Sequence, residues 1–100
     1  METLDNTVTS QRITALISEW VRLAMDDYCL SDINELVREG YCADLATWVW
    51  EELGKPRTEV LSFGNSDNPE HTWLIFEGKH YDMQCPQGVD SKELMPYFQN

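Results

Sequence analysis

Basic residues are scarce in this sequence. Its 100 residues include only 7 lysines and arginines against 18 aspartates and glutamates, so the formal net charge is -11. The acidic residues are spread along the chain and do not gather in a tail. A surface of this charge repels nucleic-acid backbones and anionic membranes, which excludes both as partners. Two interpretations of the charge stay open: it keeps the protein soluble, or it attracts a basic protein surface.

Long hydrophobic runs are also missing. No apolar stretch reaches the roughly 20 residues that a membrane-spanning helix needs. The opening Met-Glu-Thr-Leu-Asp lacks the basic and apolar regions of a secretory signal peptide, which predicts a cytoplasmic location. The three cysteines show no paired spacing, so we expect free thiols in a reducing compartment. Repeats, phosphate-binding glycine loops and basic aromatic patches are absent from the sequence as well.

Apolar residues are plentiful enough for a folded protein. They make up 42% of the chain, and a chain of this length forms one compact domain with a single core. We therefore expect one domain over residues 1–100, with residues 1–8 as a frayed lead-in.

Helical spacing dominates the first half of the chain. Thr9 or Ser10 can cap a helix that ends near Cys29, because apolar residues recur every three or four positions between them. Ser31 is expected to begin a second, shorter helix, and Gly40 to end it in the left-handed conformation. The apolar positions of the first helix are Ile13, Leu16, Ile17, Trp20, Leu23, Ala24 and Tyr28.

A third helix is predicted from Cys42 to Leu53, closed by Gly54 and Pro56. Its buried stripe begins with Cys42, and the other members of the stripe are Leu45, Ala46, Val49 and Leu53.

After Pro56 the pattern changes to the two-residue period of strands. We expect a strand around residues 60–64, a loop over 64–69, and two strands at 71–76 and 79–83 joined by a tight turn at Glu77-Gly78. Residues 85–88 are typical of a turn, and Asp90 with Glu93 can cap a short helix. Tyr97 and Phe98 are expected to fold back onto the core. The predicted class is α+β, with N-terminal helices packed on a small antiparallel sheet.

Cys42 stands directly after a glycine turn, at the start of the third helix. A thiol in that position feels the positive end of the helix dipole and the unpaired first N–H groups, which favour the reactive thiolate. Its place on a buried stripe equally suits a small core residue. Catalysis by a thiol further requires a histidine to take the proton and a carboxylate or amide to orient that histidine.

The predicted hairpin offers both groups. With a two-residue turn, His71, Trp73, His80 and Asp82 point to one side of the sheet, and His71 is the diagonal neighbour of Asp82, roughly 7 Å away at Cβ. A three-residue turn would reverse the parity and remove Asp82 from that face.

These residues resemble the transglutaminase-like branch of the papain-like cysteine enzymes. The resemblance rests on Gly-Tyr-Cys-Ala-Asp-Leu-Ala-Thr-Trp at residues 40–48, His-Thr-Trp-Leu at 71–74 and His-Tyr-Asp at 80–82. It implies a papain-like, transglutaminase-like core with a catalytic triad of Cys42 as nucleophile, His71 as base and Asp82 as orienting carboxylate. The implied activity is that of a cysteine hydrolase (thiol protease, amidase or deamidase) or a transglutaminase, acting on a protein, peptide or other amide without a cofactor.

Other interpretations of the same residues stay open. In one, all three triad positions are structural; in another, the fold is a catalytically inactive, acidic binding or inhibitor module that engages a basic protein. A metal site of His71, His80, Asp82 and Cys85 fits no standard zinc spacing, so we expect no metal.

Three further positions are candidates for substrate binding. Tyr41 precedes the cysteine, and Trp73 and His80 share the face of His71. We expect Trp73 to pack over the cysteine helix or to shield the histidine and aspartate. His80 is expected to be either an exposed strand residue opposite Ile75 or a polar group at the rim of the cleft. Cys29 and Cys85 have no basic neighbour in the sequence, which indicates buried or idle thiols.

Overall fold

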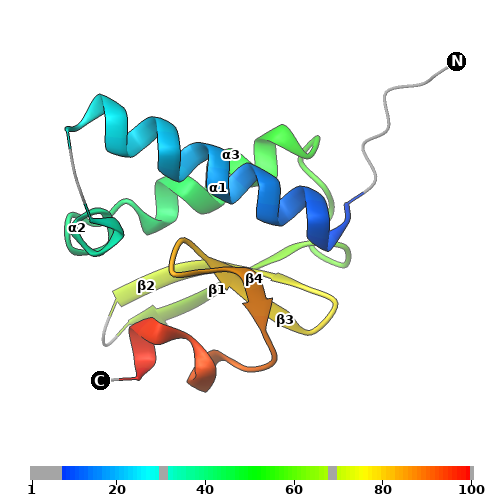
Figure 1. The fold of residues 1–100 in the computed structure, drawn as a ribbon. Coiled ribbons are helices and arrows are strands. Elements are labelled where there is room, and N and C mark those ends of the chain that lie inside the picture. The colour runs from blue at the N-terminus through cyan, green and yellow to red at the C-terminus, as the bar shows by residue number, and fades with distance from the viewer. Residues whose placement is uncertain (1–7, 30–31, 68–69, 100) are drawn as a thin grey trace, which may run out of the picture.

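The computed structural model describes residues 8–29, 32–67 and 70–99, so most of the expected lead-in and Ser31 lie outside the described residues. The fold is α+β, with N-terminal helices packed against a four-stranded antiparallel sheet of order β1-β2-β3-β4 (Figure 1). The elements are α1 (Ser10–Asp27), α2 (Ile33–Arg38), α3 (Cys42–Glu52), β1 (Ser62–Asp67), β2 (Glu70–Phe76), β3 (Lys79–Asp82), β4 (Cys85–Val89) and the 3-10 turns η1 (Lys92–Leu94) and η2 (Pro96–Phe98).

Local capping explains where the helices begin and end. The Thr9 side chain accepts a hydrogen bond from the backbone N–H of Arg12 at 3.1 Å, which confirms Thr9 as the cap of α1. Asp32 caps α2 through the N–H of Asn34. Gly40 and Gly54 follow α2 and α3 with φ of 85° each, the left-handed conformation expected of helix stops.

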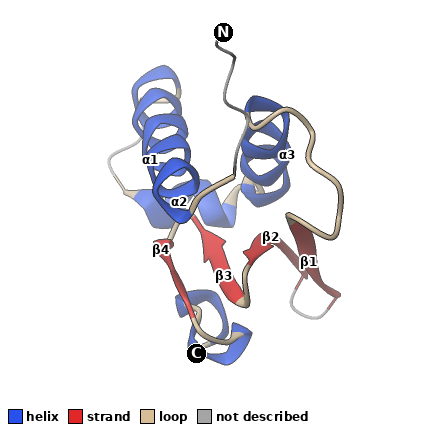
Figure 2. Ribbon diagram, turned by 90° about the vertical axis from the view of Figure 1, so that its right-hand side faces the viewer, coloured by secondary structure: helices blue, strands red, loops and turns tan. Residues whose placement is uncertain are grey.

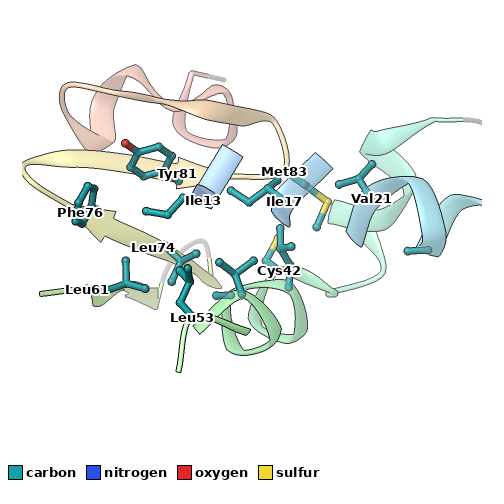
Figure 3. Packing of buried hydrophobic residues seen from close by; sticks show 14 of the residues in the cluster. Ile13, Ile17, Val21, Cys42, Leu53, Leu61, Leu74, Phe76, Tyr81 and Met83 are labelled. Atoms are coloured by element: carbon teal, nitrogen blue, oxygen red, sulfur yellow. The ribbon is translucent and has the colours of Figure 1, made fainter. Parts of the chain in front are cut away.

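The helices cover one face of the sheet (Figure 2). The predicted stripe of α3 is buried there, since Leu45, Ala46, Val49 and Leu53 are each at most 2% exposed. Side chains from the sheet pack against the stripe (Figure 3) and provide the apolar contacts that hold the two layers together. These side chains are Leu61, just before β1, together with Leu74, Phe76, Tyr81 and Met83.

The β2–β3 hairpin has the predicted register. Ile75 pairs with His80 and Phe76 with Lys79, across a turn made of Glu77 and Gly78. Both turn residues have positive φ, 51° and 79°, which matches the right-handed twist of the two strands.

Two strand predictions are wrong. β1 begins at Ser62 and continues through Gly64 to Asp67, where a loop was expected. It continues because Gly64 pairs with Trp73 of β2 and leaves room for the indole: a Cβ on Gly64 would lie 2.2 Å from the ring. A glycine at a close approach of this kind belongs to the strand and does not end it.

The second error concerns residues 85–88, which belong to β4 and not to a turn. β4 lies at the edge of the sheet, where a strand tolerates a proline because no outer neighbour needs its N–H. The carbonyl of Pro86 accepts a hydrogen bond from the Thr14 hydroxyl of α1 at 2.8 Å, which ties this edge to the helical layer.

The C-terminal turns η1 and η2 cover the face of the sheet opposite the helices. Met95, fully buried, forms a second apolar cluster there with Trp73 and Cys85. Asp90 does not cap a helix as predicted, because its carboxylate pairs with Lys79 at 3.0 Å. In the part of the chain that the structure describes, no helix has the length and apolar character to cross a bilayer.

Candidate active site

His71 and Asp82 form a buried hydrogen-bonded pair. The Nε2 atom of His71 lies 2.7 Å from Oδ2 of Asp82, and each residue is 3% exposed. β2 supplies the imidazole and β3 supplies the carboxylate, at the end of the hairpin away from its turn. The proximity expected from a two-residue turn is therefore present.

The second carboxylate oxygen of Asp82 is held from the other side. Oδ1 accepts hydrogen bonds from the backbone N–H groups of Gln84 and Cys85, at 2.9 and 3.0 Å, and contacts the Cys85 sulfur at 3.2 Å. Burial by itself would raise the pKa of Asp82, but the hydrogen bonds from His71, Cys85 and Gln84 outweigh it and lower the pKa below the ordinary value of 3.8. Asp82 is thus a carboxylate at neutral pH.

The ionised carboxylate determines which imidazole nitrogen carries the proton. A carboxylate only accepts, so the Nε2–H of His71 must donate to it, and a neutral ring then keeps its lone pair on Nδ1. Nδ1 is buried and has no hydrogen-bond partner among the described residues. Buried polar atoms without partners are rare in native proteins and call for an explanation.

Aromatic rings enclose the imidazole. Tyr97 of η2 stacks on His71 with ring centroids 3.9 Å apart and planes 9° apart, and Trp73 stacks at 5.6 Å. The Tyr97 hydroxyl donates to the Glu70 carbonyl at 2.8 Å, which holds the ring in place. The C-terminal turns therefore restrict the orientation of His71 as well as its contact with water.

Cys42 lies at the start of α3, as expected, but its surroundings do not favour a thiolate. The residue is 7% exposed and belongs to the apolar cluster between the helices and the sheet (Figure 3). Burial, and next the negative charge of Asp82, raise the pKa of Cys42 to about 12. The expected lowering of the Cys42 pKa by the helix start is thus overturned. Burial destabilises the thiolate more than the hydrogen bond from the backbone N–H group stabilises it.

The imidazole and the thiol approach the end of the sheet from different sides. Strand alternation places His71 with Trp73, on the face covered by the C-terminal turns, whereas Cys42 packs with Leu74 on the helical face. No hydrogen bond joins the Cys42 sulfur to Nδ1 of His71. The structure therefore brings together two members of the predicted triad, and leaves the third nearby without a bond to them.

The three predicted substrate-binding residues do not share one surface. Tyr41 stacks on Tyr28 at 4.9 Å, beside α1. Trp73 is 2% exposed and packs under the C-terminal turns, so the expectation that it covers the cysteine helix is wrong, whereas its contact with His71 fits the shielding role. His80 lies opposite Ile75, as the hairpin register predicts, and its Nδ1 atom accepts a hydrogen bond from the indole N–H of Trp73 at 2.9 Å.

Sequence reasoning missed two residues that contact the pair, Cys85 and Tyr97. Cys85 was expected to be buried or idle; it is buried, and its sulfur also contacts the carboxylate of Asp82. The three-residue spacing between Asp82 and Cys85 is a signal that could have found it, since an aspartate in a turn accepts hydrogen bonds from the residues that follow. Tyr97 carried no comparable signal. Cys29 is exposed and free.

The described residues contain no group of three or more His, Cys, Asp or Glu side chains placed to hold a metal ion. Comparison with protein-family models, with curated proteins and with solved structures finds no match to this chain.

Proposed function

We propose that the protein is a thiol-dependent acyl-transfer or amide-hydrolysing enzyme with a papain-like, transglutaminase-like core. Cys42 is the nucleophile, His71 the general base and Asp82 the carboxylate that orients the base. The proposal covers peptidase, amidase, deamidase and transglutaminase chemistry, because these reactions share the acyl-thioester and differ in the acceptor, which is water or an amine.

The observation that carries the proposal is the buried His71 Nδ1 atom without a partner. Asp82 holds the opposite nitrogen at 2.7 Å, so the lone pair available to take a proton lies on Nδ1. Among the described residues, the Tyr81 hydroxyl and Oε1 of Gln84 are also buried without a partner, so what distinguishes Nδ1 of His71 is that its ring is oriented by a carboxylate. A free nitrogen on an oriented imidazole is what a general base requires.

The pKa of Cys42 decides the form of the mechanism. At a pKa of about 12 the resting thiol is protonated, so a preformed thiolate–imidazolium pair is not the starting state. Proton transfer must accompany attack, and it requires that substrate binding first bring the thiol and the imidazole together, because they lie on different faces of the sheet in the resting structure. The sulfur then bonds to the carbonyl carbon while its proton passes to Nδ1 of His71. The imidazolium then returns the proton to the leaving group as the carbon–heteroatom bond breaks, which leaves an acyl-thioester on Cys42.

Acylation by p-nitrophenyl acetate tests this mechanism without knowledge of the natural substrate. We expect a burst of p-nitrophenolate and an acetyl group on Cys42, located by peptide mass spectrometry in the full-length protein. His71→Ala should abolish acetylation of Cys42 and leave that of the exposed Cys29 unchanged, so Cys29 is an internal control for simple solution chemistry. If only Cys29 is acetylated in the unsubstituted protein, the enzyme proposal is wrong.

A second candidate function is a catalytically inactive binding module that engages a basic protein. The burial of Cys42 among core residues and its raised pKa favour this candidate, and the net charge of -11 supplies the attraction. A partner captured with the unsubstituted protein should then be captured equally by Cys42→Ala. Loss of capture with Cys42→Ala would instead tie the partner to the thiol.

A further inference from the structure

We propose that Cys85 is a positioning residue of the His71–Asp82 pair, because its thiol donates a hydrogen bond to the carboxylate oxygen of Asp82 that faces away from the imidazole. The positioning itself rests on the observed pair. Its consequence for catalysis rests on the function proposed above.

The geometry at Asp82 separates the tasks of the two carboxylate oxygens. Oδ2 faces the imidazole of His71, and Oδ1 faces the turn that leads into β4. A carboxylate without contacts at Oδ1 can rotate about its Cβ–Cγ bond, which would move Oδ2 off the line to Nε2. Donors at Oδ1 oppose that rotation. The backbone N–H groups of Gln84 and Cys85 do so whatever the side chain at position 85, and the Cys85 sulfur at 3.2 Å adds the one side-chain donor that the described residues place there.

The surroundings of Cys85 keep it in the donor form. Its pKa is raised to about 12, first by burial and then by the charge of Asp82, so the S–H proton remains in place at neutral pH. The residue is 9% exposed and packs against Trp73 and Met95, which limits the positions open to the sulfur. The carbonyl of His80, at 3.8 Å from the sulfur, is the more distant acceptor.

Substitutions at Cys85 separate hydrogen bonding from packing. Cys85→Ser keeps a donor at nearly the same place. Cys85→Val fills a similar volume without a donor, and Cys85→Ala removes both donor and volume. Cys29→Ala is the matched control, because it removes an exposed thiol far in sequence from the pair.

The readout is the Nε2–H proton of His71, observed by nitrogen-correlated NMR in the full-length protein, with Cys29→Ala as the reference variant. We expect a deshielded, slowly exchanging signal in the unsubstituted protein, in Cys29→Ala and in Cys85→Ser. In Cys85→Val and Cys85→Ala the proton should exchange about tenfold faster, the equilibrium change that one hydrogen bond to a charged group provides. The backbone amide spectrum verifies folding, so either variant decides the question if the other does not fold.

An unchanged Nε2–H shift and exchange rate in the folded Val or Ala variant would show that Cys85 only packs, and would overturn the proposal. The catalytic consequence has its own assay. If Cys42 is acetylated by p-nitrophenyl acetate, the Val and Ala variants should slow that acetylation and Cys85→Ser should restore it. If Cys42 is never acetylated, the enzyme proposal fails, and the NMR result still decides the positioning role.

Discussion

Replacing Asp82 in two ways tests the buried pair most directly. Asp82→Ala removes the acceptor of four contacts, from His71, Gln84 and Cys85. Asp82→Asn keeps the shape and one acceptor oxygen. The asparagine oxygen can continue to accept from the turn, while its amide group faces Nε2 of His71 as a donor. The imidazole must then accept at Nε2 and carry its proton on Nδ1, which is the tautomer that cannot act as a base.

The structure gives the expected sizes of the two effects. In Asp82→Ala the donors of His71 and Cys85 are buried and lose their acceptor, whereas the N–H of Gln84 is partly buried and can be reached by water. Two buried N–H donors left unsatisfied, those of His71 and Cys85, at about 1.5–2.5 kcal/mol each give about 3–5 kcal/mol of lost unfolding free energy. Asp82→Asn should cost about 1–2 kcal/mol, because most of the hydrogen bonds survive in altered form.

Urea denaturation followed by circular dichroism measures both differences, and acetylation of Cys42 by p-nitrophenyl acetate measures the catalytic one. We expect Asp82→Asn to remain folded and to lose acetylation of Cys42, while Cys29 reacts as before. Equal loss of stability in the two variants would refute the hydrogen-bond reasoning. Normal acetylation in Asp82→Asn would refute the assignment of the base.

Three further predictions follow from burial and close contacts. Gly64→Ala should cost about 1–3 kcal/mol in urea denaturation, because the new methyl group overlaps the indole that packs on Gly64. Gly78→Ala meets open space and should cost only the roughly 1–2 kcal/mol of its left-handed backbone. A smaller loss for Gly64→Ala than for Gly78→Ala would argue against the overlap. The pKa of Asp82 is lowered on folding, so the contribution of its carboxylate to stability is complete above pH 3.8 and declines as the pH falls below that value toward the folded pKa. The difference in unfolding free energy between the unsubstituted protein and Asp82→Asn should therefore shrink over that acid range. A constant difference would contradict a lowered pKa. Iodoacetamide should label the exposed Cys29 about 100-fold or more faster than Cys42, whose pKa is about 12, and comparable rates by peptide mapping would show that the thiol of Cys42 is open to water.

Local signals made much of the fold predictable. Helix caps, apolar spacing and helix-ending glycines act within a few residues, so α1, α3 and their ends could be predicted from sequence alone. The two-residue turn at Glu77 and Gly78 sets the strand parity, and parity alone brings His71 to Asp82. The His71–Asp82 pair could therefore be predicted from the local sequence of one hairpin.

Long-range packing decided what the sequence left open. Both faces of β2 are apolar, with Trp73 on one and Leu74 on the other, so periodicity could not tell which face the helices would cover. The partner of Gly64 and the edge position of Pro86 are equally invisible in local patterns. These features explain the missed extent of β1 and the missed strand β4.

For Cys42, the sequence predicts the position of the residue, and the tertiary structure determines whether its thiol is protonated. Its position at a helix start is written in the sequence, because a glycine turn and an apolar stripe place it there. Its protonation is not, because the free energy of a thiolate depends on how much water and which charges surround the sulfur. Only the tertiary structure assembles that environment, by closing α1 and the sheet over the thiol and bringing the charge of Asp82 within range.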